Sequence, residues 1–176
     1  MSKGIRIPLA DAISQCNIIE NLLQEYSTAN NTPILEYMIV GSIRRKTIDC
    51  GDGDIVFWEK DRETLTSIIN LNKNLFSKIE AMKSGKINNV TMSSGFKIDF
   101  WFAKENCWWH KIQFYTGSWD YNEVIIKNIN MTGKYLGRIG FYDELGKQII
   151  VNSEEELFSM YNINYTIPEN RSLTNE

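Results

Sequence analysis

The chain has 176 residues, of which 43% are hydrophobic and 12% aromatic, so it can bury a core and is not expected to be disordered. Its 22 acidic and 19 basic residues give a net charge of −3, which argues against a broad basic face for gripping duplex DNA. Three widely spaced cysteines and one histidine argue against a disulfide framework and a zinc site, and no apolar stretch approaches the roughly 20 residues of a membrane span.

Helical and strand-like patterns alternate along the first hundred residues, which predicts an α+β fold. Apolar residues at helical spacing predict helices, and short runs rich in β-branched and aromatic residues predict strands. Asp61 is in position to cap the second helix, and glycine turns separate the later strands. The predicted elements are a helix over 9–28, strands over 35–40 and 54–58, a helix from 61 to about 73, and strands over 76–82, 87–92 and 96–102.

The remaining residues predict a smaller lobe of mixed structure. A glycine turn at Gly117 leads into a predicted helix over 118–131. Two short strands are expected around 139–142 and 148–151. A capping box at Ser153-Glu154-Glu155-Glu156 then predicts the start of another helix.

The stretch from Gly41 to Phe57 carries the most specific chemical signal. Asp52 and Asp54 stand two residues apart at the edge of a predicted strand, so their side chains point to the same face. Two anions this close repel each other unless a cation lies between them, and hard carboxylate oxygens suit Mg²⁺ or Mn²⁺. An isolated Asp-x-Asp pair is more often a capped turn, so the neighbouring residues decide the interpretation.

Those neighbours suit the usual partner of such a metal, a phosphate. Ser42 offers a hydroxyl and Arg45 a planar guanidinium with five donors, while Gly41 and Gly51 let the backbone approach a ligand closely. Metal-holding carboxylates beside phosphate-holding groups are the components of nucleotidyl transfer.

A third carboxylate is predicted on a later strand. Ile98, Phe100 and Phe102 share one face of the segment 96–102, and Asp99 shares the other face with Lys97 and Trp101. A strand with one solvated side would show the same pattern. Beside Asp52 and Asp54, however, Asp99 is the natural third metal ligand.

A local basic surface is predicted on the smaller lobe. Lys127, Lys134 and Arg138 occur within twelve positions that contain no acidic residue, and they are the candidate DNA-binding residues. Several aromatic residues precede them. Most are expected in the core, although an exposed one could stack on a base.

Taken in order, these motifs resemble family X DNA polymerases, the group of DNA polymerase beta, over nearly the whole chain. The signature around 41–57 alone would indicate only the broader nucleotidyltransferase superfamily. The matching motifs are Arg6-Ile7-Pro8, Gly-Ser-x-Arg-Arg from Gly41, Gly-Asp-x-Asp from Gly51, Ile98-Asp99, Tyr115-Thr116-Gly117-Ser118, Tyr121-Asn122, Ser-Glu-Glu-Glu-Leu-Phe from Ser153, and Pro168-Glu169-x-Arg171.

The resemblance implies a nucleotidyltransferase palm over residues 1–105, with a mixed sheet flanked by helices, and a small α+β nucleotide-selecting subdomain over 106–176. It implies two Mg²⁺ or Mn²⁺ ions held by Asp52 and Asp54, with Asp99 binding the catalytic ion and helping to deprotonate the primer 3′-hydroxyl. The implied nucleotide-binding residues are Gly41, Ser42, Arg45 and Gly51 at the phosphates, Arg6 at the γ-phosphate, Tyr115 and Gly117 at the sugar, Trp119 against the base, and Asn122 at its minor-groove edge.

The activity implied is template-directed, gap-filling DNA synthesis from a dNTP on primer-template or gapped DNA, by a monomer with no membrane association. The family's lyase domain and DNA-binding fingers are missing, so we expect no lyase activity, and Gly53 replaces a larger apolar residue. Minimal viral polymerases of the family also lack these parts, so a phage or virus source is plausible. We expect a reducing, cytoplasmic location, which is the host cytoplasm or the virion if the source is viral.

Two other functions stay open. The same metal site could serve a template-independent nucleotidyltransferase that acts on a nucleic acid end, a protein or a small molecule, and the acidic net charge favours this reading. A degenerate binding module without activity is the weakest alternative, because all three carboxylates are present.

Overall fold

The computed structural model describes residues 5–131, 135–137, 140–143, 145–160 and 162–172, which form six α-helices and three β-sheets. The α+β class predicted from the sequence is thus confirmed. The helices are α1 (Leu9–Asn30), α2 (Gly41–Arg44), α3 (Arg62–Leu71), α4 (Trp108–Thr116), α5 (Trp119–Met131) and α6 (Glu154–Met160). The strands are β1 (Ile7–Pro8), β2 (Tyr37–Val40), β3 (Asp49–Cys50), β4 (Asp52–Trp58), β5 (Phe76–Ala81), β6 (Ile87–Met92), β7 (Lys97–Ala103), β8 (Tyr135–Gly137), β9 (Gly140–Tyr142) and β10 (Gln148–Ile149).

A mixed five-stranded sheet with the order β2-β4-β7-β6-β5 forms the centre of the first lobe. The central strands β4 and β7 run parallel, and every other pairing in this sheet is antiparallel. Parallel strands need a long crossover connection, and here α3, β5 and β6 lie in sequence between them. Strands β1 and β3 pair separately at the end of the lobe where β4 begins.

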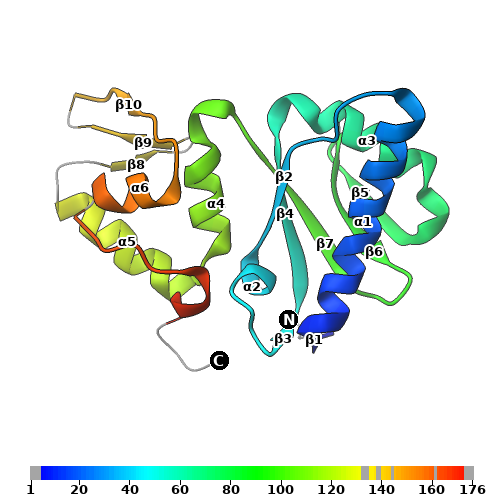
Figure 1. Ribbon diagram of the computed structural model, residues 1–176, viewed down its shortest axis with the longest axis horizontal. Coiled ribbons are helices and arrows are strands. Elements are labelled where there is room, and N and C mark those ends of the chain that lie inside the picture. The colour runs from blue at the N-terminus through cyan, green and yellow to red at the C-terminus, as the bar shows by residue number, and fades with distance from the viewer. Residues whose placement is uncertain (1–4, 132–134, 138–139, 144, 161, 173–176) are drawn as a thin grey trace.

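The central strands are covered on both faces, so they are apolar on both sides. Ile55 and Phe57 point into the core beneath α1 and α3, whereas Val56 packs with Ile112 of α4 on the opposite face. Figure 1 shows α1 and α3 on one side of the sheet and α4 on the other. Because strand side chains alternate, Asp52 and Asp54 share the α4 side with Val56.

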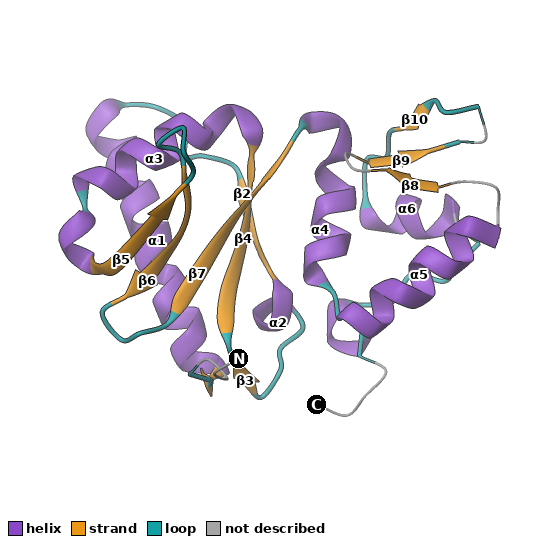
Figure 2. Cartoon of the chain, turned by 180° about the vertical axis from the view of Figure 1, so that it is seen from behind, coloured by secondary structure: helices purple, strands orange, loops and turns teal. Residues whose placement is uncertain are grey.

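The second lobe consists of α4, α5, α6 and the antiparallel sheet β10-β9-β8. Tyr121 and Ile125 of α5 pack with Val151 and with Leu157 and Phe158 of α6 in a separate small core. Figure 2 shows α4 between the main sheet and the rest of this lobe. Helix α4 therefore belongs to the packing of both lobes.

Helix α4 is the largest difference from the sequence-based expectation, which has no helix over 108–116. The segment is rich in aromatic and β-branched residues, which have low helix propensity. Burial outweighs that propensity here, since Trp108 and Ile112 stand four residues apart on one helical face and pack onto the sheet.

Two capping predictions are corrected in detail. Asp61 precedes α3, but its side chain makes no capping hydrogen bond because a 3₁₀ turn (Glu59–Asp61) already gives it a helical backbone. At α6, the Ser153 hydroxyl accepts the backbone N–H of Glu156 at 3.1 Å, as predicted. The Glu156 carboxylate accepts the N–H of Asn152 at 2.8 Å, one residue earlier than a capping box requires.

A buried ion network joins the two lobes. The Glu154 carboxylate receives hydrogen bonds from Arg44 Nη2 at 2.6 Å and from Arg171 Nη1 at 2.8 Å. Arg171 is fully buried and Glu154 is 2% exposed. Burial alone would raise the pKa of Glu154, but the hydrogen bonds from Arg44 and Arg171 outweigh it and hold that pKa below the usual range.

Candidate functional site

The pairing of β4 with β7 brings the three predicted carboxylates together. Asp54 lies directly opposite Asp99, and Asp52 opposite Lys97, in the parallel register. A Cβ atom at Gly53 would lie 2.9 Å from the Cys16 sulfur of α1, which leaves no room for a side chain there. Glycine between the two acids therefore lets α1 pack closely beneath them.

Burial and repulsion between neighbouring carboxylates raise the pKa of Asp52 and of Asp54. Burial raises the pKa of Asp54 to about 6, the hydrogen bond from Trp101 opposes this, and the charges of Asp52 and Asp99 add to the increase. Burial, followed by the charge of Asp99, also raises the pKa of Asp52. Such mutual repulsion is what a bound cation would relieve.

Neighbouring donors already hold two of the carboxylates. Trp101 Nε1 donates to Asp54 Oδ1 at 2.7 Å, and Lys97 Nζ lies 2.8 Å from Asp99 Oδ1. Within the described ranges, no group of three His, Cys, Asp or Glu side chains is arranged to hold a metal ion directly. The donor set, three carboxylates on one face of adjacent strands, nevertheless suits Mg²⁺ or Mn²⁺ once these donors move.

A cavity of about 430 Å³ opens beside Asp52 and Asp54, between the lobes. All nine predicted nucleotide-binding residues line it, together with Phe114 and Ser118, which sequence reasoning missed. Asp99 instead lines an adjoining cavity of about 440 Å³. Tyr115 lines both cavities. The predicted nucleotide-binding residues are Arg6, Gly41, Ser42, Arg45, Gly51, Tyr115, Gly117, Trp119 and Asn122.

Three of the predicted phosphate-binding residues lie in the short helix α2 or at its end, namely Gly41, Ser42 and Arg45. The Ser42 hydroxyl is buried and has no hydrogen-bond partner, so it is available to a ligand that enters the cavity. Arg45 donates to the carbonyl oxygen of Thr116, which ties α2 to the end of α4. Arg6 Nε donates to Asp49 Oδ1 at 2.8 Å at the cavity edge. An orphaned hydroxyl beside two guanidinium groups fits a phosphate.

The residues predicted to contact the sugar and the base come from the second lobe. Tyr115 stacks on Trp101 with ring centroids 4.1 Å apart. Trp119 is 68% exposed at the cavity rim, where its ring can cover a ligand. Asn122 is buried, and its amide is engaged by Gln113 Nε2 at 2.9 Å and the Phe114 carbonyl at 2.7 Å. Its remaining hydrogen-bonding capacity is what a ligand could use.

The predicted DNA-binding residues are only partly described. Lys127 lies on α5 with an exposed side chain and lines neither cavity. Lys134 and Arg138 lie outside the described residues.

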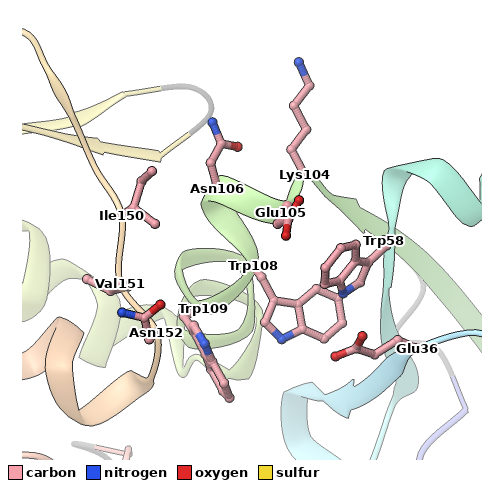
Figure 3. Close-up of a pocket in the computed structure, with 10 residues that line it drawn as sticks. All are labelled: Glu36, Trp58, Lys104, Glu105, Asn106, Trp108, Trp109, Ile150, Val151 and Asn152. Carbon is pink, nitrogen blue, oxygen red and sulfur yellow. The ribbon is translucent and has the colours of Figure 1, made fainter.

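A larger cavity of about 670 Å³ lies at the opposite end of the main strands. Figure 3 shows Trp58 and Trp108 side by side with Glu36 next to them, and Trp109 further along α4. None of the predicted site residues lines this cavity. The smaller cavity at the carboxylates is therefore the candidate site.

Comparison with known proteins adds no assignment. No protein-family model matches the chain, and no curated protein matches it. No helix among the described residues is long and apolar enough to cross a membrane. The functional argument consequently rests on the geometry of the site.

We expect Gly41→Ala to disrupt the site directly. Gly41 has φ +66°, and a Cβ atom there would lie 2.3 Å from Asp54 Oδ2, so alanine must displace the carboxylate. Gly85→Ala is the matched control, because Gly85 has φ +79° with no atom within 4 Å of its Cβ position. Both variants should lose about 1 kcal/mol of unfolding free energy to backbone strain. Only Gly41→Ala should also change Mn²⁺ binding in calorimetry, and equal metal binding by both would refute the close contact.

We expect the metal-free stability to depend on pH through Asp54. The pKa of Asp54 is raised from 3.8 to about 6, so the folded state binds this proton more tightly than the unfolded state does. Its contribution to stability is present below about pH 4 and is lost as the pH rises through 6. As the pH rises from 4 to 7.5, the unfolding free energy of Asp54→Asn should therefore increase by about 2 kcal/mol relative to that of the wild type. Urea unfolding with EDTA measures this, and parallel pH curves would contradict it.

Proposed function

We propose that the protein is a template-directed DNA polymerase of the gap-filling type, related to family X DNA polymerases. It would transfer a nucleotide from a dNTP to a primer 3′-hydroxyl and release pyrophosphate. The observation that carries the proposal is the single cavity in which Asp52 and Asp54 face a buried free hydroxyl, Ser42, and the guanidinium of Arg45. A triphosphate with its divalent cations has matching chemistry.

Asp52, Asp54 and Asp99 would hold two Mg²⁺ or Mn²⁺ ions. When bound, these ions would neutralise the triphosphate and acidify the attacking hydroxyl. Asp99 lines the adjoining cavity, where the 3′-hydroxyl of an acceptor strand would bind. The Asp99 carboxylate would accept the proton of that hydroxyl. Tyr115, which lines both cavities, would orient the nucleotide relative to that acceptor.

The remaining cavity residues would bind the nucleotide without taking part in bond formation. Ser42 and Arg45 would bind phosphate oxygens, together with the Gly51 backbone and Arg6. Gly117 precedes α5 with φ +65°, and a Cβ atom there would lie 3.0 Å from Arg45 Nη1, so its lack of a side chain leaves room for the Arg45 guanidinium. Trp119 would stack on the base.

A template-independent nucleotidyltransferase is the second candidate. The net charge of −3 favours it, because a template-reading enzyme must hold DNA phosphates. Primer extension on gapped duplex, compared with extension of a single-stranded primer, separates the two. Extension that needs the gap and follows the template base supports the polymerase. Equal, untemplated extension of both would favour the alternative, and no extension with any dNTP would refute the proposal.

We expect Arg45→Ala to weaken dNTP binding by about ten- to a hundredfold, because a charge-assisted hydrogen bond to phosphate is lost. Binding of primer-template should change much less. Lys127→Ala provides the opposite control, since Lys127 is exposed and lies outside the cavity. Fluorescence titrations with dNTP and with labelled DNA give both constants. A larger loss on the DNA side for Arg45→Ala would assign this guanidinium to the nucleic acid.

A further inference from the structure

The ammonium group of Lys97 lies among the acids of the candidate metal site. Lys97 Nζ is 2.8 Å from Asp99 Oδ1 and 2.9 Å from Asp99 Oδ2, so it engages both oxygens of that carboxylate. In the sheet register Lys97 also lies directly opposite Asp52. The charges of Asp52 and Glu80 act on the same ammonium group, in addition to that of Asp99.

We propose that Lys97 is an internal counter-ion of the metal site, whose ammonium group holds the place of a cation beside Asp99 and is displaced when a divalent ion binds. This inference rests on the proposed function only in assigning the three carboxylates to a metal. Metal binding would then be an exchange of one cation for another.

The exchange follows from the geometry of Asp99. A Mg²⁺ or Mn²⁺ ion needs carboxylate oxygens at roughly 2.0–2.2 Å, and the ammonium group that lies within 2.9 Å of both oxygens of Asp99 would repel such an ion. Asp99 is only 17% exposed, so its oxygens offer little other surface. The Lys97 side chain is 45% exposed and flexible, so it can turn into solvent when the ion arrives.

The sheet offers a matched control two strands away. Lys78 and Glu80 on β5 repeat the arrangement of Lys97 and Asp99 on β7, with an ion pair between residues two apart on one face. Both pairs belong to the same rows across the sheet, since Thr91 pairs with Lys78 and with Lys97. The Lys78 side chain is 64% exposed and lines neither of the two cavities beside the carboxylates.

The test is calorimetric titration of Mn²⁺ into protein free of nucleotide and DNA. Lys97→Met should bind Mn²⁺ about tenfold more tightly than the wild type, because a positive charge near the divalent ion is gone. Lys97→Arg and Lys78→Met should stay within about twofold of the wild type. Lys97→Gln serves as a second neutral variant if Lys97→Met misfolds. Adding Asp99→Asn to Lys97→Met should abolish the gain.

Equal or weaker Mn²⁺ binding by both neutral variants overturns the counter-ion role, as does the same gain in Lys78→Met. Primer extension by the wild type judges the proposed function separately. If the wild type extends a primer but the neutral Lys97 variants gain no Mn²⁺ affinity, only the role of Lys97 is rejected. A tighter Mn²⁺ site without extension keeps that role and rejects the polymerase.

Discussion

Replacing Asp52, Asp54 or Asp99 with alanine should in each case reduce nucleotide incorporation by at least about a thousandfold. The three side chains share one face of β4 and β7, and losing one would remove a ligand of the ions that neutralise the transition state. A loss of about 4 kcal/mol of transition-state stabilisation corresponds to this factor. Single-turnover incorporation of one dNTP on gapped DNA with Mg²⁺ measures it.

The folded state should survive these substitutions, because burial and repulsion already disfavour the charges of Asp52 and Asp54. Asp61→Ala is the control, since Asp61 lies beyond the far end of β4 and lines neither cavity. Its activity should equal that of the wild type. Near-normal turnover by any of the three site variants would remove that residue from the metal site.

Glu154→Ala should destabilise the protein by about 3–5 kcal/mol, the largest stability effect that we expect. Its carboxylate is the shared partner of Arg44 and the fully buried Arg171, so alanine leaves buried charges uncompensated. Urea unfolding followed by circular dichroism at neutral pH measures the change.

Glu155→Ala is a matched control one residue away. Glu155 is exposed on the same helix, and its loss should change the unfolding free energy by no more than about 0.5 kcal/mol. If Glu154→Ala unfolds at the same urea concentration as Glu155→Ala, the network does not stabilise the junction of the lobes.

The sequence predicts local features of this protein well where one pattern dominates. The helix expected over 9–28 is α1, and the apolar runs around 37–40 and 55–58 lie in β2 and β4. Alternation alone places Asp99 with Lys97 and Trp101 on one face, and the hydrogen bond from Trp101 to Asp54 agrees with it. Such features depend on residues close in sequence, so periodicity is sufficient to find them.

Other features depend on distant residues and could not be predicted from local patterns. Nothing near Glu154 in the sequence indicates Arg44, which is 110 positions away, and the acid instead suggests an exposed first turn of a helix. The hydrogen bond from Arg45 to the Thr116 carbonyl likewise joins residues 71 positions apart. Helix α4 itself is specified by contacts with both lobes, which outweigh its strand-like composition.

The end of the chain has a mechanical consequence. After α6, residues 162–172 return to the junction of the lobes: Ser118 of the second lobe donates its N–H and hydroxyl to the Arg171 carbonyl, and Lys46 of the first lobe pairs with Glu169 at 2.6 Å. This returning segment adds to the other contacts that join the lobes, which are the packing of α4 on the sheet, the Arg44–Glu154 ion pair and the hydrogen bond from Arg45 to Thr116. A movement that widens the cavity between Ser42 and Trp119 must therefore stretch or break several of these contacts together.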